Sequence, residues 1–85
     1  MTYEQKQNFI RLSNDVNGNP RYYIGCYELA GLVRATTEEV EAVAIKAGFR
    51  KYRGKKYGAG YVVVSYNLNN SLDYLEAQLE RAMQK

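Results

Sequence analysis

Apolar and polar residues alternate in two stretches of the first third of the chain. From Asn8 to Ser13 the alternation is typical of a half-buried strand. Residues 14–20 then collect turn-forming types around Asn17-Gly18, a pair suited to positive φ values. Alternation resumes from Arg21 to Leu29. The pattern predicts a hairpin with a long loop.

The next segment changes to a helical period. Thr36 is followed three residues later by Glu39, which forms a capping box at the start of a helix. Four apolar residues then recur at positions i, i+3, i+4 and i+7: Val40, Val43, Ala44 and Ala47. Gly48 is well placed to end the helix in a left-handed conformation. Ile45 lies off this stripe, so it is either exposed or in contact with a partner.

The second half of the chain repeats this scheme. Phe49–Arg53 and Tyr61–Leu68 are predicted strands, joined by a glycine-rich connection at 54–60. Asn70 is a candidate cap for a final helix. Its apolar residues are Leu72, Leu75, Leu79 and Ala82, with Met83 beside them.

The element order is therefore ββα followed by ββα. It predicts a single α+β domain over residues 1–85, in which residues 1–7 are a polar lead-in. We expect a four-stranded, mainly antiparallel sheet with two helices packed on one face. Segments 22–29 and 61–68 share two tyrosines and a leucine at matching positions, which leaves an internal duplication open.

Composition removes several classes of activity. With one cysteine and no histidine, the chain lacks the residues of zinc fingers and of Ser–His–Asp or Cys–His nucleophile systems. The glycine-rich connection has neither the Gly-Lys-Ser/Thr ending of a P-loop nor the helix of a dinucleotide-binding fingerprint. We therefore expect no enzymatic activity, no metal and no cofactor, and an enzyme that uses carboxylates stays open only as a third option. We place Cys26 mid-strand as a buried thiol.

Charge is distributed unevenly along the sequence. No Asp or Glu occurs from Ala42 to Leu72, yet half of the twelve cations lie within this stretch. They alternate with aromatic residues, so that phosphate contacts and stacking on unpaired bases could occur together. Gly54, Gly58 and Gly60 would let the loop backbone approach a ligand. The predicted site lies in the hairpin at 49–61 and consists of Arg50, Lys51, Tyr52, Arg53, Lys55, Lys56 and Tyr57.

A plainer interpretation of the same residues remains open. Cations beside a valine-rich strand also protect a sheet edge from aggregation. Alternation along the strand places Arg50 and Tyr52 on one face and Lys51 and Arg53 on the other.

The segments 17–24 and 57–68 give the chain a wider resemblance. In both, the chain resembles small accessory proteins of bacteriophages and mobile elements. The resemblance implies a small binder of nucleic acid or of a host protein. Inhibitors of host defence, including anti-CRISPR proteins, are well represented among such proteins.

Two functional hypotheses follow from the hairpin and the resemblance. In the first, the hairpin binds nucleic acid or a nucleoprotein, with Lys51, Arg53, Lys55 and Lys56 on phosphate. In the second, the protein inhibits a nucleic-acid-binding host protein complex by occupying an acidic groove or the nucleic-acid channel. The chain starts without the apolar stretch of a secretory signal and has no membrane-length apolar run, so we expect it in the bacterial host cytoplasm. Exposed sheet edges and tyrosines would permit a homodimer.

Overall fold

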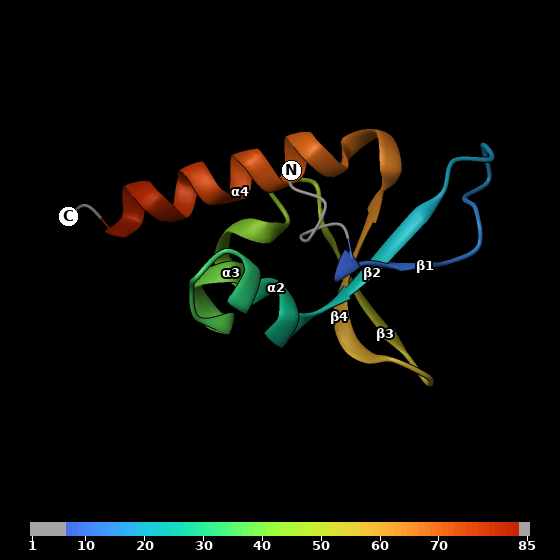
Figure 1. Ribbon diagram of the computed structural model, residues 1–85, viewed down its shortest axis with the longest axis horizontal. Helices are drawn as coiled ribbons and strands as arrows, with labels where there is room; N and C mark the ends of the chain where they lie inside the picture. Colours follow the sequence, from blue (N-terminus) through green and yellow to red (C-terminus); the bar gives the residue numbers. More distant parts are fainter. Residues whose placement is uncertain (1–6, 84–85) are drawn as a thin grey trace.

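One antiparallel sheet with helices on one side makes up the structure, a computed structural model that describes residues 7–83 (Figure 1). The strand order in the sheet is β1-β2-β4-β3. The elements in chain order are β1 (Ile10–Arg11), β2 (Arg21–Gly25), α2 (Cys26–Leu32), α3 (Thr37–Ala44), β3 (Arg50–Gly54), β4 (Gly58–Val64), a 3₁₀ helix (Ser65–Asn67) and α4 (Leu68–Met83). The predicted α+β class and four-stranded antiparallel sheet are confirmed.

The core lies between the sheet and the helices. Ile24 of β2 pairs with Tyr61 of β4, and both side chains are buried on the helix-facing side of the sheet. Helices α2 and α4 contact β4, while α3 packs against α2 and α4. Phe49, which is fully buried, meets the Tyr61 ring edge-on at a centroid distance of 6.4 Å. Burying such side chains stabilises a domain by about 1.5–3 kcal/mol each.

The predicted features of α3 and α4 are largely confirmed. The Thr36 hydroxyl accepts a hydrogen bond from the Glu39 N–H, and the Glu39 carboxylate accepts one from the Thr36 N–H, which completes the capping box. Gly48 has a φ of 99°, as its place after the helix requires. Ile45 is 55% exposed. In α4 the predicted stripe is buried at Leu72, Leu75 and Leu79, whereas the side chains of Ala82 and Met83 lie outside the described part.

The predicted strand Arg21–Leu29 is wrong in its second half. Strand β2 ends at Gly25, and Cys26 is the first residue of α2. The four apolar residues Cys26, Leu29, Ala30 and Val33 follow the i, i+3, i+4, i+7 spacing of a helix, and all four belong to the core or pack against it. Burial of this helical face therefore outweighs the strand-like alternation. The described part of the chain has three α-helices over the sheet instead of the expected two.

Other boundaries shift for local reasons. Strand β1 is only two residues long, and the preceding Phe9 is buried in the core. Strand β4 begins at Gly58 and stops at Val64, where the Ser65 N–H donates to the Pro20 carbonyl at 2.9 Å. Asn70 is not a cap, because α4 already starts at Leu68.

The two similar segments 22–29 and 61–68 share a structural transition. Each is a strand for its first four residues and helical for its last four, with the change after Gly25 and after Val64. Their common leucines, Leu29 and Leu68, are buried, and the tyrosines two residues earlier, Tyr27 and Tyr66, are exposed. The shared residues thus mark a strand-to-helix junction.

Candidate nucleic-acid interface

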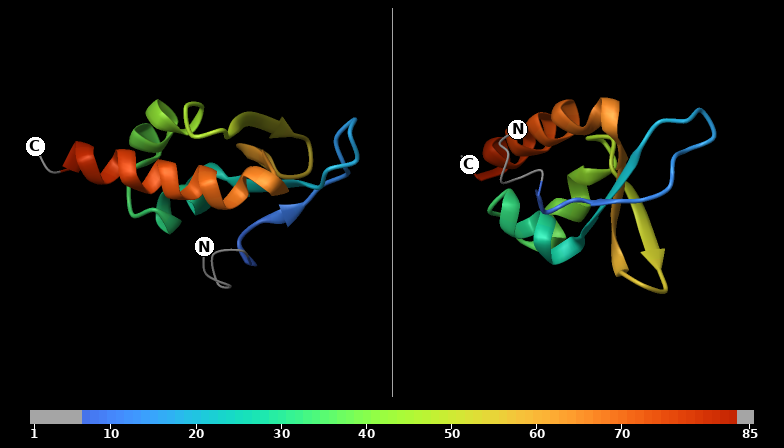
Figure 2. Two further views of the ribbon diagram at one scale, coloured as in Figure 1. Left: turned by 90° about the horizontal axis from the view of Figure 1, so that it is seen from above. Right: turned by 45° about the vertical axis from the view of Figure 1, so that its right-hand side comes forward.

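The β3–β4 hairpin projects beyond the helices (Figure 2). Because side chains alternate along a strand, its register assigns each predicted residue to a face. Lys51 pairs with the core residue Tyr61, and Arg53 pairs with Ala59, so both cations lie on the helix-facing side. Tyr52 pairs with Gly60 on the outer side. The predicted division of the cations between two faces follows from this register.

A tyrosine cluster holds the outer face of the hairpin. Tyr23 of β2 is only 3% exposed, and its ring stacks on Tyr57 at a centroid distance of 5.2 Å and meets Tyr52 edge-on at 5.6 Å. The Tyr23 hydroxyl lies 3.0 Å from the Tyr57 carbonyl and 3.2 Å from that of Ala59, either of which can accept its proton. Burial raises the pKa of Tyr23 above its usual 10.0. Tyr52 and Tyr57 are therefore partly engaged in the fold.

Two of the three hairpin glycines make room for these rings. A Cβ on Gly60 would overlap the Ile24 carbonyl oxygen and lie 2.6 Å from the Tyr23 ring, while one on Gly54 would lie 2.9 Å from the Tyr52 ring. Both glycines are thus covered by tyrosine from within the protein, and only Gly58 opens onto free space. Of the three glycines predicted to let a ligand approach the backbone, Gly58 alone has room for one.

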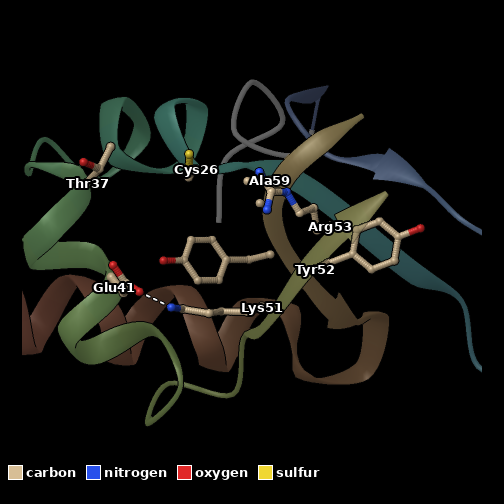
Figure 3. Close-up of a pocket in the computed structure, with 9 residues that line it drawn as sticks. Cys26, Thr37, Glu41, Lys51, Tyr52, Arg53 and Ala59 are labelled. Atoms are coloured by element: carbon tan, nitrogen blue, oxygen red, sulfur yellow. Dashed lines mark hydrogen bonds and ion pairs between the residues drawn. The ribbon is translucent and has the colours of Figure 1, made fainter. Parts of the chain in front are cut away.

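A pocket of about 510 Å³ opens on the helix-facing side of the hairpin (Figure 3). Lys51 reaches across to Glu41 of α3 and forms an ion pair, and this hydrogen bond raises the pKa of Lys51. Arg53 also lines the pocket and lies apart from that pair. Burial, together with the nearby Glu41 carboxylate, raises the pKa of Tyr61 above 10.0.

The hairpin cations differ in their internal partners. Within residues 7–83, Lys51 is the hairpin cation with an ion-pair partner, and no carboxylate pairs with Arg50, Arg53, Lys55 or Lys56. The Lys56 ammonium lies 5.4 Å from the centre of the Tyr57 ring. The structure brings all seven predicted site residues together on one hairpin, distributed over two faces and the turn.

Sequence reasoning misses two residues of this region. Alternation assigns Tyr23 to a strand face without a role, although Tyr23 fixes the hairpin. Glu41 lies on α3, and only a view of the tertiary contacts pairs it with Lys51, ten residues away in the chain. The sequence does indicate on which face Tyr23 lies. Its neighbour Ile24 is apolar and faces the core, so Tyr23 must face the opposite, outer side of the sheet.

Other site types find no support in the described part of the chain. Residues 7–83 hold no group of three or more His, Cys, Asp or Glu side chains that could bind a metal ion. In the same range, no helix has the length and apolar character needed to cross a membrane.

Comparison with known protein families gives a match over the whole chain. The family model of the Staphylococcus phage terminal repeat-encoded protein TreK matches residues 1–85. The chain belongs to the TreK family. This membership confirms the resemblance to phage accessory proteins. No curated protein and no solved structure matches the chain.

Proposed function

We propose that this TreK-family protein is a non-enzymatic nucleic-acid-binding protein that acts inside the bacterial host through the β3–β4 hairpin. The observation that carries the proposal is that four cations without an ion-pair partner within residues 7–83 lie together on one hairpin: Arg50, Arg53, Lys55 and Lys56. Cations that are already paired gain less from a phosphate, whereas unpaired cations release the counterions of the nucleic acid when they bind.

The shape of the hairpin supports the same function. It extends past the helices, so its turn lies where a nucleic-acid strand can reach it (Figure 2). The tyrosine cluster keeps the hairpin rigid, which lowers the entropic cost of placing the cations on phosphates. Tyr57, half-buried beneath Lys56, offers an aromatic surface beside the cations.

Fluorescence anisotropy with labelled single- and double-stranded DNA and RNA, across a salt series, tests this function. Wild type is compared with a variant that carries Ala at the four unpaired cations Arg50, Arg53, Lys55 and Lys56. A matched control removes four exposed cations elsewhere: Arg11, Arg34, Lys46 and Arg81.

We expect salt-sensitive binding, with a slope of log K against log salt that falls by about 0.7–0.9 for each phosphate that the variant no longer neutralises. The hairpin variant should bind far more weakly than wild type, and the control almost as tightly. Absence of binding at low salt, or equally weakened binding in the two variants, would contradict the proposal.

A second function is favoured by a separate observation. A pocket of about 490 Å³ opens between β1 and the hairpin turn, and two exposed apolar side chains line it: Ile10 and Tyr27, the latter 78% exposed. Aromatic residues of this kind are enriched at protein interfaces. We propose as the alternative an inhibitor that docks on a nucleic-acid-binding host protein complex. A stoichiometric complex that survives nuclease treatment and does not form with Tyr27→Ala would support it over the first function.

A further inference from the structure

The pocket on the helix-facing side of the hairpin is lined by polar groups besides the cations that would contact phosphate. Its volume of about 510 Å³ falls within the roughly 300–1,000 Å³ of small-molecule sites. Tyr61 supplies an aromatic wall, and Thr37 and Glu41 of α3 face the hairpin across the opening. Figure 3 shows Lys51 reaching Glu41 on one side of the pocket and Arg53 on another.

The charges in this pocket select one kind of ligand. The Lys51 ammonium is balanced by the Glu41 carboxylate, so Arg53 provides the unbalanced positive charge. A guanidinium binds a phosphate through two parallel hydrogen bonds. The Glu41 carboxylate repels a second anion, yet it can accept a hydrogen bond from a neutral N–H group, and Lys51 can donate one. A ligand with one phosphate and a neutral polar ring matches this arrangement.

We propose that the pocket binds one nucleotide, with its phosphate at Arg53 and its base beside the Glu41–Lys51 pair. The inference rests on the proposed function, because a strand lying along β3 would supply the nucleotide. A free mononucleotide presents the same chemistry. Only an unpaired base can enter a pocket, so the hairpin should prefer single strands over duplexes.

Cys26 provides a probe of ligand binding here, and because it also lines the pocket beside β1, the variants described next assign the protection to one pocket. It is the only cysteine of the chain, it is half-buried, and it lines this pocket. The rate of its alkylation by iodoacetamide, followed by mass spectrometry, should fall several-fold when a nucleoside monophosphate is added at millimolar concentration. Inorganic phosphate at the same concentration should protect it much less.

The matched variants are Arg53→Gln and Arg50→Gln. Both remove one arginine charge from β3, but Arg53 is on the pocket side and Arg50 on the outer side. Protection of Cys26 by the nucleotide, taken as the ratio of rates with and without ligand, should disappear in Arg53→Gln and persist in Arg50→Gln. An equal decrease in both variants would overturn the pocket assignment in favour of general charge attraction.

Oligonucleotides separate the two sources of the ligand. An eight-nucleotide single strand should protect Cys26 in an Arg53-dependent way, and the duplex of the same sequence should not. Protection by the mononucleotide without any oligonucleotide binding would contradict the proposed function and assign the pocket to a free nucleotide. If no nucleotide protects Cys26 while oligonucleotides still bind, the pocket proposal fails and the hairpin function stands.

Discussion

The two hairpins of the sheet carry arginines that are used in opposite ways. In the β1–β2 hairpin, an Arg11 Nη donates to the Asn14 side chain at 3.1 Å, and the Arg21 Nε donates to the Ser13 carbonyl at 2.9 Å. In the β3–β4 hairpin, Arg50 and Arg53 have neither a side-chain hydrogen bond nor an ion pair within the described residues. Arginines of the first hairpin hold its own loop, whereas those of the second remain available to a ligand.

The two hairpins also differ in what holds them. A single carboxylate organises the first loop: Asp15 accepts hydrogen bonds from the N–H groups of Asn17 and Asn19, both at 2.9 Å. The second hairpin has strands of five and seven residues, against two and five in the first, and it is held from outside by Tyr23 of the neighbouring strand β2, whose hydroxyl contacts its turn. The polar side chains of the first hairpin are used within its own loop, whereas the tyrosines that hold the second hairpin leave Arg50, Arg53, Lys55 and Lys56 without an ion-pair partner in residues 7–83.

The largest expected effect comes from removing the Tyr23 ring. Tyr23→Ala should lower the free energy of unfolding by about 3–5 kcal/mol, because it deletes a buried ring in contact with Tyr52 and Tyr57. Ile10→Ala, its cross-strand neighbour in β1, should cost less than about 1 kcal/mol because Ile10 is 40% exposed. Urea denaturation measures both. Similar destabilisation in the two variants would contradict the role of Tyr23 as the side chain that holds the second hairpin.

A smaller destabilisation is expected when a methyl group is added in the space that the Tyr23 ring occupies. Gly60→Ala should cost about 2–3 kcal/mol, because the added methyl overlaps the Ile24 carbonyl and displaces the Tyr23 ring. Gly18→Ala in the first hairpin meets no atom within 4 Å and suffers only from its φ of 83°, at about 1–2 kcal/mol. Thermal or urea unfolding measures the destabilisation of each variant, and a larger loss in Gly18→Ala than in Gly60→Ala would contradict this explanation.

Removing the Tyr23 hydroxyl alone should have a more modest effect. Tyr23→Phe should cost about 1 kcal/mol at pH 7, because the hydroxyl no longer donates to the turn carbonyls. The pKa of Tyr23 is raised above 10.0 on folding, so this contribution is complete below pH 10 and is lost as the pH rises through the folded value. The difference between wild type and variant should therefore narrow at high pH. A difference independent of pH would show that the hydroxyl is not the cause.

The smallest effect is the pH dependence of the first hairpin. The Asn19 N–H, followed by that of Asn17, lowers the pKa of Asp15 below its usual 3.8. The stabilisation is then complete above about pH 5 and is lost as the pH falls through the lowered value. Asp15→Asn should shift the urea midpoint slightly at pH 6, and the shift should vanish near pH 2. A shift that persists in acid would assign it to packing.

Local signals in the sequence predict the parts of the fold that depend on neighbouring residues. The capping box at Thr36 and Glu39, the left-handed Gly48 and the apolar stripe of α4 each involve residues within a few positions of one another. The sequence pattern misses helix α2 because the first residues of this helix also alternate, and only burial of Leu29 and Ala30 against the core decides between the two periods.

The sequence predicts where the candidate site residues lie along the hairpin, but not the geometry around them. Alternation along β3 correctly separates Arg50 from Arg53. The partners that give these faces their character come from elsewhere in the chain: Tyr23 from β2 and Glu41 from α3. Such long-range pairs depend on how the helices and strands pack, which one sequence without its structure does not specify.

The most direct test of the unpaired-cation account compares the two hairpins in one binding assay. Lys55→Gln/Lys56→Gln and Arg11→Gln/Arg21→Gln each remove two positive charges, from the second and the first hairpin respectively. Anisotropy with a single-stranded oligonucleotide across a salt series would give the slope for each protein. The account predicts a slope reduced by about 1.4 for the Lys55/Lys56 variant, and an unchanged slope for the Arg11/Arg21 variant. Equal slopes in all three proteins, or a larger change in the Arg11/Arg21 variant, would contradict it.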